Sequence, residues 1–93
     1  MATKLSETEI TERLDDLGGW TRTGDEIRRT FALASFPAAI AFVTHLSFLA
    51  EAAGHHPNID IRYNRVTLAL TTHDAGGLTS NDFDLAAQAD EIL

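Results

Sequence analysis

Three helix start signals divide this 93-residue chain into regular segments. Ser6 and Glu9 have the spacing of a reciprocal capping box, and Thr79 and Asp82 repeat that spacing near the end of the chain. Ser35 marks a third start, because a proline follows it within the first turn. Glycines at positions 18–19 and 54 end the first two segments. The sequence therefore predicts three helices with two non-helical stretches between them.

Each non-helical stretch has the alternating pattern of two short strands. Residues 20–33 alternate around a Gly24-Asp25 turn, and residues 59–71 alternate around Asn64-Arg65. A two-residue loop at Asn64-Arg65 places Tyr63 opposite Val66, with the apolar side chains on one face. The predicted fold class is α+β, in the order α-β-β-α-β-β-α, with a four-stranded antiparallel sheet and helices packed on one face. Residues 1–93 are expected to form a single domain.

The second helix has apolar side chains at helical spacing. We expect its core face to consist of Ile40, Val43, Ser47 and Ala50, widened by Phe42, Leu46 and Leu49. His45 lies within the same helix and is interpreted as a structural or interface residue. Trp20, the single tryptophan, is predicted to pack against one edge of the core.

Charge and composition exclude several classes of function. Fourteen acidic and seven basic residues give a formal net charge of −7, so neither nucleic acid nor a membrane is expected as a partner. The absence of cysteine rules out disulfides, thiolate catalysis and cysteine-based zinc sites. We expect no membrane span, because no apolar run approaches about 18 residues, and no signal peptide, because Met1 to Ile10 is too polar. These features predict a cytoplasmic protein.

Four histidines stand out in this composition, and two of them are adjacent, in His55-His56-Pro57. This run follows a helix end, in a loop where functional side chains are common, and Glu51 lies one helical turn before it. His73 is predicted to close the last strand, and the antiparallel hairpin returns it to the end that carries His55 and His56. Three histidines are therefore expected to converge. The alternative is that they are ordinary solvated side chains.

Two further interpretations stand beside this one. Three histidines and a glutamate can hold zinc or iron, but the chain has no His-x-His, His-x-x-x-His or Glu-x-x-His pair. We therefore expect neither a metal nor another cofactor. Asp82 has a structural interpretation of its own, as the fourth residue of the last capping box.

Five short runs in the second half of the chain form a specific combination. They are Glu51-Ala-Ala-Gly-His55-His56-Pro57, Tyr63-Asn64-Arg65-Val66, Thr72-His73, Gly77-Leu78 and Asp82. Together with Gly19-Trp20 and residues 27–31, they resemble the pterin-4a-carbinolamine dehydratase family over the whole chain. The resemblance implies dehydration of 4a-hydroxytetrahydropterin to quinonoid dihydropterin, a step in recycling the pterin that aromatic amino-acid hydroxylases use.

The resemblance also implies roles for the site residues. The catalytic and pterin-binding set would be His55 as base, His73 as general acid and His56 as the residue that orients the pterin, with exchange of these roles left open. Glu51 would tune the imidazoles, and Asp82 would fix the loop around His73. Pro57 completes the supporting residues.

One position departs from the family pattern. Many members have an aromatic residue two positions after the proline, where this chain has Ile59. If that aromatic side chain stacks on the pterin, affinity or substrate preference differs in this chain.

The family further implies a homodimer or homotetramer, with dimers continuing the sheet and tetramers joining through helices. The alternative to an enzyme is a non-catalytic interaction or regulatory module on the same fold. The three histidines favour the enzyme, because binding through a helix face does not require them.

Overall fold

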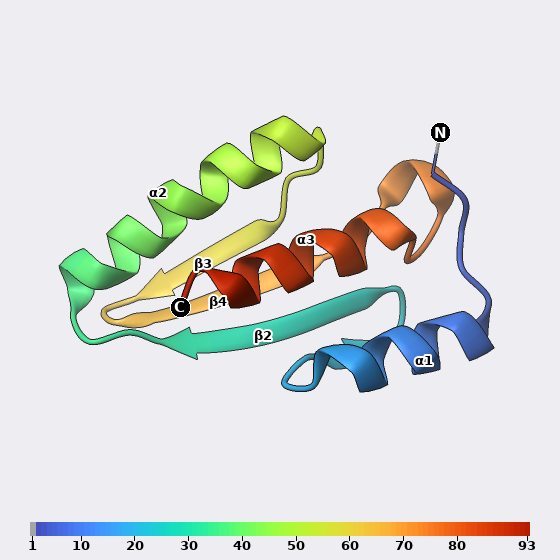
Figure 1. Ribbon diagram of the computed structural model, residues 1–93, viewed down its shortest axis with the longest axis horizontal. Helices are drawn as coiled ribbons and strands as arrows, with labels where there is room; N and C mark the ends of the chain where they lie inside the picture. Colours follow the sequence, from blue (N-terminus) through green and yellow to red (C-terminus); the bar gives the residue numbers. More distant parts are fainter. Residues whose placement is uncertain (1) are drawn as a thin grey trace.

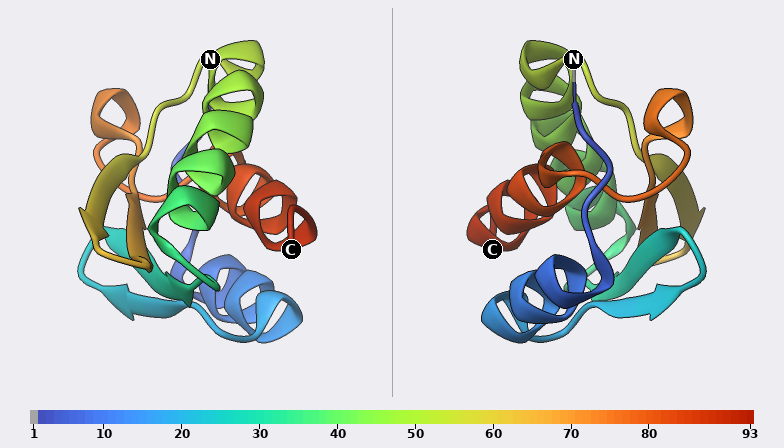
Figure 2. Two further views of the ribbon diagram at one scale, coloured as in Figure 1. Left: turned by 90° about the vertical axis from the view of Figure 1, so that its left-hand side faces the viewer. Right: turned by 90° about the vertical axis from the view of Figure 1, so that its right-hand side faces the viewer.

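The computed structural model describes residues 2–93, so Met1, the first residue of the predicted domain, lies outside the described residues. The predicted order of three α-helices and four strands is confirmed, with one short 3-10 helix before the last α-helix. The α-helices lie on one face of the sheet (Figure 1, Figure 2). The elements are α1 (Glu7–Leu17), β1 (Thr21–Thr23), β2 (Glu26–Ala32), α2 (Phe36–Ala53), β3 (Asn58–Arg62), β4 (Arg65–Leu70), η1 (His73–Ala75) and α3 (Ser80–Glu91).

The strands lie in the order β1-β2-β4-β3, and every neighbouring pair is antiparallel. The predicted position of the hairpin loop, at Asn64-Arg65, is wrong by one residue. β3 and β4 pair Arg62 with Arg65 and Ile61 with Val66, so the loop consists of residues 63 and 64. The register therefore differs by two residues from the predicted one. A shift of two preserves the alternation of faces, so the apolar side chains still share one face.

Two local interactions explain where this hairpin turns. Tyr63 has a positive φ of 55°, the conformation that a two-residue hairpin loop requires at its first central position. The side-chain Nδ2 of Asn64 donates to the carbonyl oxygen of Leu33 at 2.8 Å, and the carbonyl oxygen of Asn64 accepts from the backbone N–H of Leu33 at 2.8 Å. Asn64 is thereby held in the turn.

Helix α2 begins after Ser35, whose hydroxyl oxygen accepts from the backbone N–H of Ala38, and ends at Gly54, as predicted. The buried positions differ from the predicted stripe, since Ile40 is 39% exposed. The buried side chains are those of Ala39, Phe42, Leu46 and Ala50. With 18 residues and a mean hydropathy of 1.4, α2 is long and apolar enough to cross a membrane by length and composition. The expectation that no segment is that apolar is therefore wrong, although one stripe of α2 packs into the core.

The core lies between the sheet and the helices, and Trp20 closes one edge of it as predicted. Its ring is buried and meets the ring of Phe31 edge to face, with 6.1 Å between centroids. The indole Nε1 donates to the carboxylate of Asp90 at 3.0 Å, and Nη1 of Arg29 donates to the same carboxylate at 2.8 Å. These contacts tie the end of α3 to the sheet.

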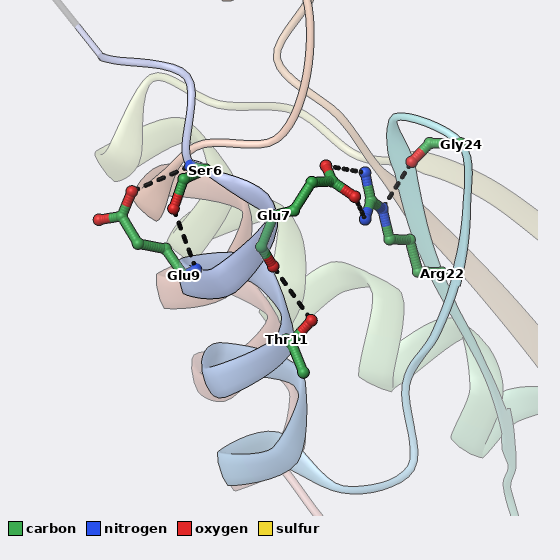
Figure 3. A network of polar contacts seen from close by, with 6 residues as sticks. All are labelled: Ser6, Glu7, Glu9, Thr11, Arg22 and Gly24. Atoms are coloured by element: carbon green, nitrogen blue, oxygen red, sulfur yellow. Dashed lines mark hydrogen bonds and ion pairs between the residues drawn. The ribbon is translucent and has the colours of Figure 1, made fainter.

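The predicted capping box of α1 is present (Figure 3). The hydroxyl oxygen of Ser6 accepts from the backbone N–H of Glu9, and Oε1 of Glu9 accepts from the backbone N–H of Ser6. The guanidinium of Arg22 donates to both oxygens of Glu7, at 2.7 and 2.9 Å, and so joins α1 to β1. These hydrogen bonds lower the pKa of each glutamate and raise the pKa of Arg22.

Candidate active site

The loop after α2 is shaped by the glycine that ends this helix. Gly54 has the left-handed conformation, with φ 63°, and its N–H caps the last turn. The backbone N–H of His55 then donates to the carbonyl oxygen of Ala50 at 3.1 Å. This hydrogen bond holds the start of the loop against the helix end, so the position of His55 is set by backbone contacts. The side chain of His55 is mostly buried, with 12% of its surface exposed, whereas that of His56 is 66% exposed.

The sequence predicted that His73 closes the last strand, and this prediction is wrong. β4 ends at Leu70, and His73 is the first residue of η1. A bridge between Thr72 and Gly77, with hydrogen bonds of 3.2 and 3.3 Å in both directions, closes a tight loop after the strand. Inside that loop, residues 73–75 form one turn of 3-10 helix, which begins at His73.

The predicted convergence of the three histidines is present. His55, His56 and His73 line one open cleft of about 220 Å³, together with Gly54, Thr71, Thr72 and Asp74. Figure 1 shows why segments far apart in sequence meet here: the end of α2, the turn of η1 and the start of α3 lie on the same side of the molecule. The ring of His73 is exposed and makes no hydrogen bond or ion pair with any other residue among 2–93.

A buried carboxylate holds His55. Asp82 is fully buried, and its Oδ1 lies 2.5 Å from Nε2 of His55. Its Oδ2 accepts from the hydroxyl of Thr72 at 2.8 Å and from the backbone N–H of Thr79 at 2.9 Å. A carboxylate buried without a cation needs such donors to offset the loss of water. The predicted capping box of α3 is therefore confirmed, and the same side chain also reaches the histidine cleft.

The direction of these hydrogen bonds follows from the groups involved. The hydroxyl of Thr72 donates to Asp82, so its oxygen accepts from the hydroxyl of Thr79, which lies 2.9 Å away. The tautomer of His55 is assigned from this contact: a carboxylate only accepts when it is ionised, and Nε2 of His55 then carries the proton that it shares with Asp82. In a neutral imidazole, Nδ1 of His55 is then the acceptor nitrogen.

The other predicted site residues lie around this cleft in different ways. Oε1 of Glu51 lies 2.8 Å from Nε2 of His56, and both side chains are exposed, so Glu51 contacts His56 and not His55. Asp82 reaches the His73 loop through Thr72 and contacts His55 directly. Pro57 is half-buried just before β3 and does not line the cleft.

Some residues of the cleft had no signal of their own in the sequence. Thr71 and Asp74 line it, and their position close to the Thr72-His73 run is the only feature that points to them. Ile59, at the position of the family aromatic, is 40% exposed and lines a different hollow over β4. Among residues 2–93, no group of three or more histidine, aspartate or glutamate side chains has an arrangement that could hold a metal ion.

Comparison with known proteins identifies the family of this chain. The sequence model of the family described as pterin 4 alpha carbinolamine dehydratase matches residues 3–92. The chain belongs to this family. A relative from Roseiflexus sp. strain RS-1, provisionally named pterin-4-alpha-carbinolamine dehydratase, is 72% identical over the full length of both chains. A relative of the same name from Chloroflexus aurantiacus is 70% identical over 97% of both chains. The chain is therefore an enzyme of the hydro-lyase class, a 4a-hydroxytetrahydrobiopterin dehydratase.

Two solved structures have a similar fold. The crystal structure of a transcriptional coactivator/pterin dehydratase from Brucella melitensis superposes with a TM-score of 0.93, at 34% identity over 97% of this chain and 98% of that chain. A pterin dehydratase-like protein described as a RuBisCO assembly factor in the alpha-carboxysome superposes with a TM-score of 0.64, at 26% identity over 78% of this chain and 84% of that chain.

Proposed function

We propose that the three-histidine cleft dehydrates 4a-hydroxytetrahydropterin to quinonoid dihydropterin by general acid–base catalysis, as a step in tetrahydropterin recycling. The observation that carries the proposal is the pair of His55 and the buried Asp82 at the edge of a cleft that His56 and His73 also line. The proposal includes a cytoplasmic location, for which a cysteine-free chain is suitable.

The reaction requires two proton transfers at neighbouring atoms. The bond between C4a and its hydroxyl oxygen breaks, and a general acid supplies the proton with which that oxygen leaves as water. The lone pair of N5 forms the C4a–N5 double bond, and a base accepts the N5 proton. Each group then returns to its starting state by proton exchange with water. No electron transfer and no covalent intermediate are needed, so two positioned imidazoles supply all of the chemistry.

His55 is suited to the role of base. With its Nε2 proton directed at Asp82, its acceptor nitrogen is Nδ1. When Nδ1 accepts a proton, the ring becomes a cation beside the carboxylate of Asp82, which stabilises that charge. The fixed ring orientation also removes rotational freedom that would otherwise be lost at each turnover.

His73 and His56 take the remaining roles. The ring of His73 is exposed and has no partner among residues 2–93, so it is free to exchange protons with water and to protonate the leaving hydroxyl. His56 shares a proton with Glu51 at the rim of the cleft, which orients its ring but leaves it solvated. We assign His56 to pterin binding for that reason. A non-catalytic module would need Asp82 as a helix cap, but it would not need that carboxylate to orient His55 in a cleft with two further histidines.

The test of the proposed function is turnover of the carbinolamine itself. 4a-Hydroxytetrahydropterin is generated in the assay, and formation of the quinonoid product is followed by absorbance with and without the protein. We expect acceleration of at least about 10²-fold over the uncatalysed dehydration. Dialysis against a chelator is expected to leave the rate unchanged, because the steps above use no metal. A rate equal to that of the protein-free reaction would contradict the proposal.

We also propose that the enzyme is a homodimer or homotetramer. Apolar side chains on the outer side of α2 are exposed, with Phe36 at 47%, Ile40 at 39% and Phe48 at 71%. β3 is an edge strand with one side unpaired, and Ile59 on it is 40% exposed. An isolated chain of this size gains stability when a second copy covers such surfaces.

Phe48→Glu is expected to weaken this association. Each copy would lose the burial of one phenylalanine, about 2 kcal/mol, and a symmetric interface contains that side chain twice. The dissociation constant should rise by about 10²-fold or more, which sedimentation velocity over a concentration series measures. Thr8→Glu adds the same charge on the exposed side of α1 and serves as the control. A wild-type protein that sediments as a 10.1 kDa monomer at all concentrations would refute the assembly.

A further inference from the structure

Thr72 lies between the histidine cleft and the buried capping box of α3, and no step of the proposed mechanism uses it. Its side chain is half-buried at the wall of the cleft, directly before His73. Its hydroxyl donates to Oδ2 of Asp82 at 2.8 Å and accepts from the hydroxyl of Thr79 at 2.9 Å. Thr72 therefore contacts the carboxylate oxygen that does not contact His55.

The direction of the Thr72 hydroxyl is fixed by its neighbours. Oδ2 of Asp82 also accepts from the backbone N–H of Thr79 at 2.9 Å. The hydroxyl oxygen of Thr79 is held in turn, because it accepts from the backbone N–H of Asn81 at 3.3 Å. Among residues 2–93, no buried side-chain nitrogen or oxygen lacks a hydrogen-bond partner. The hydroxyl of Thr72 is thus directed at the carboxylate by a closed set of hydrogen bonds.

A donor on one carboxylate oxygen changes the interaction that the other oxygen makes. A hydroxyl that donates to an ionised carboxylate stabilises part of its negative charge. This stabilisation matters most when His55 is neutral, because the carboxylate of Asp82 then has no cation beside it. Thr72 therefore favours the neutral form of His55, which is the form that can act as a base. Without Thr72, Asp82 would hold the proton on His55 more tightly.

The other charged groups around His55 do not depend on Thr72. The titratable side chains at or beside the cleft, other than that of His55, are those of Glu51, His56, His73, Asp74 and Asp82. Within residues 2–93, only Asp82 makes a hydrogen bond or ion pair with the side chain of His55, and the other four side chains are exposed to solvent. Because solvent and salt screen exposed charges, a change at Thr72 reaches His55 mainly through the buried carboxylate.

We infer that Thr72 is a positioning residue that keeps His55 working as a base, through its hydrogen bond to Asp82. The inference rests on the proposed function. The hydroxyl of Thr72 does not have to touch the reacting atoms. It fixes the carboxylate and limits the negative charge that His55 meets, so that the imidazole gives up its proton to water after each turnover.

Thr72→Val tests this inference, because it replaces the hydroxyl by a methyl group of nearly the same shape. The reaction needs a neutral base and a protonated acid, so kcat/KM should have a bell-shaped dependence on pH. On the acidic side of that profile we expect kcat/KM to fall about threefold, which corresponds to about half a pH unit. On the alkaline side it should equal the wild-type value, because His73 is outside this set of hydrogen bonds. Thr72→Ser keeps the hydroxyl and should restore the wild-type profile.

Thr30→Val is the matched control. The hydroxyl of Thr30 lies 2.8 Å from that of Thr67, so this variant also removes a hydrogen bond between two threonines. Both residues are on paired strands of the sheet, and neither lines the histidine cleft. We expect the pH profile of Thr30→Val to equal that of the wild type. Thr72→Ala removes the same hydroxyl with less volume and replaces Thr72→Val if the added methyl group disturbs the fold.

A second measurement separates failure of this inference from failure of the proposed function. Nitrogen NMR of protein with labelled histidines follows the protonation of His55 without turnover, and single histidine variants assign the signals. In Thr72→Val, His55 should lose its proton about half a pH unit higher than in the wild type, and Thr72→Ser should match the wild type. An equal loss of kcat/KM at every pH, or an unchanged titration of His55, would overturn the inference. Absence of turnover by the wild type would instead count against the proposed function.

Discussion

His55→Ala and His73→Ala are each expected to lower kcat for dehydration by about 10²–10⁴-fold, because a positioned proton-transfer group contributes that much. In the proposed mechanism the two imidazoles act at opposite ends of the C4a–N5 bond, so loss of either leaves one of the two proton transfers to water. Both side chains line the same cleft, and neither is part of the hydrophobic core. The measurement is steady-state turnover of 4a-hydroxytetrahydropterin by each purified variant.

His45→Ala is the matched control for this pair. His45 lies on the exposed surface of α2, beside α3, and does not line the histidine cleft. Its loss should leave kcat and KM unchanged. His56→Ala should raise KM more than it lowers kcat, since His56 is assigned to binding. Unchanged turnover in both His55→Ala and His73→Ala would rule out histidine acid–base catalysis here.

Asp82→Asn is expected to lower kcat by about 10²–10³-fold while the protein stays folded. An asparagine oxygen can still accept from Thr79 and Thr72, so the start of α3 keeps its cap. Its amide group would donate towards Nε2 of His55, which forces the imidazole proton onto Nδ1. The base would then present a donor where the reaction needs an acceptor. The loss should appear in kcat, with little change in the urea midpoint.

Asp82→Ala separates the two functions of this side chain. It removes the acceptor for three buried or half-buried donors, and we expect the free energy of unfolding to fall by about 3 kcal/mol. Urea unfolding followed by circular dichroism measures this change. Equal turnover in wild type and Asp82→Asn would mean that Asp82 is only a helix cap. Equal stability of wild type and Asp82→Ala would mean that its hydrogen bonds contribute nothing to folding.

The helix boundaries could be predicted from sequence because they depend on local chemistry. Ser6, Ser35 and Thr79 each satisfy backbone N–H groups within a few residues, and Gly18 and Gly54 end their helices through a conformation that glycine adopts easily. The alternation of apolar residues in the strands was equally local. The order of elements and the antiparallel sheet therefore followed from short stretches of sequence.

The hairpin register shows where local pattern stops being sufficient. Alternation fixes which face a residue occupies, but registers that differ by two residues give the same faces. The turn is instead set by a contact between Asn64 and Leu33, which are 31 residues apart, and by a positive φ at Tyr63, uncommon for a bulky side chain. Neither feature can be read from the residues of the hairpin alone.

The meeting of the candidate histidines could be predicted from the sequence, whereas most of their contacts could not. The three histidines meet as expected because an antiparallel hairpin returns the chain to its starting end. The partner of His55 could not be derived from spacing, since Asp82 is 27 residues away and already had a complete local explanation as a cap. Glu51 was expected to serve both imidazoles, but its carboxylate reaches only His56.

One carboxylate oxygen of Asp82 contacts His55 and the other accepts from Thr72 and Thr79. These contacts determine how many segments of this chain a designer would have to transfer to rebuild the site in another protein. A graft of the loop that carries His55 alone would bring an imidazole without its orienting acceptor. The smallest unit that keeps the arrangement has three separate pieces: the end of α2 with its loop, the turn from Thr71 to Gly77, and the first turn of α3. A design based on this site would therefore have to include all three segments, each with its own backbone geometry.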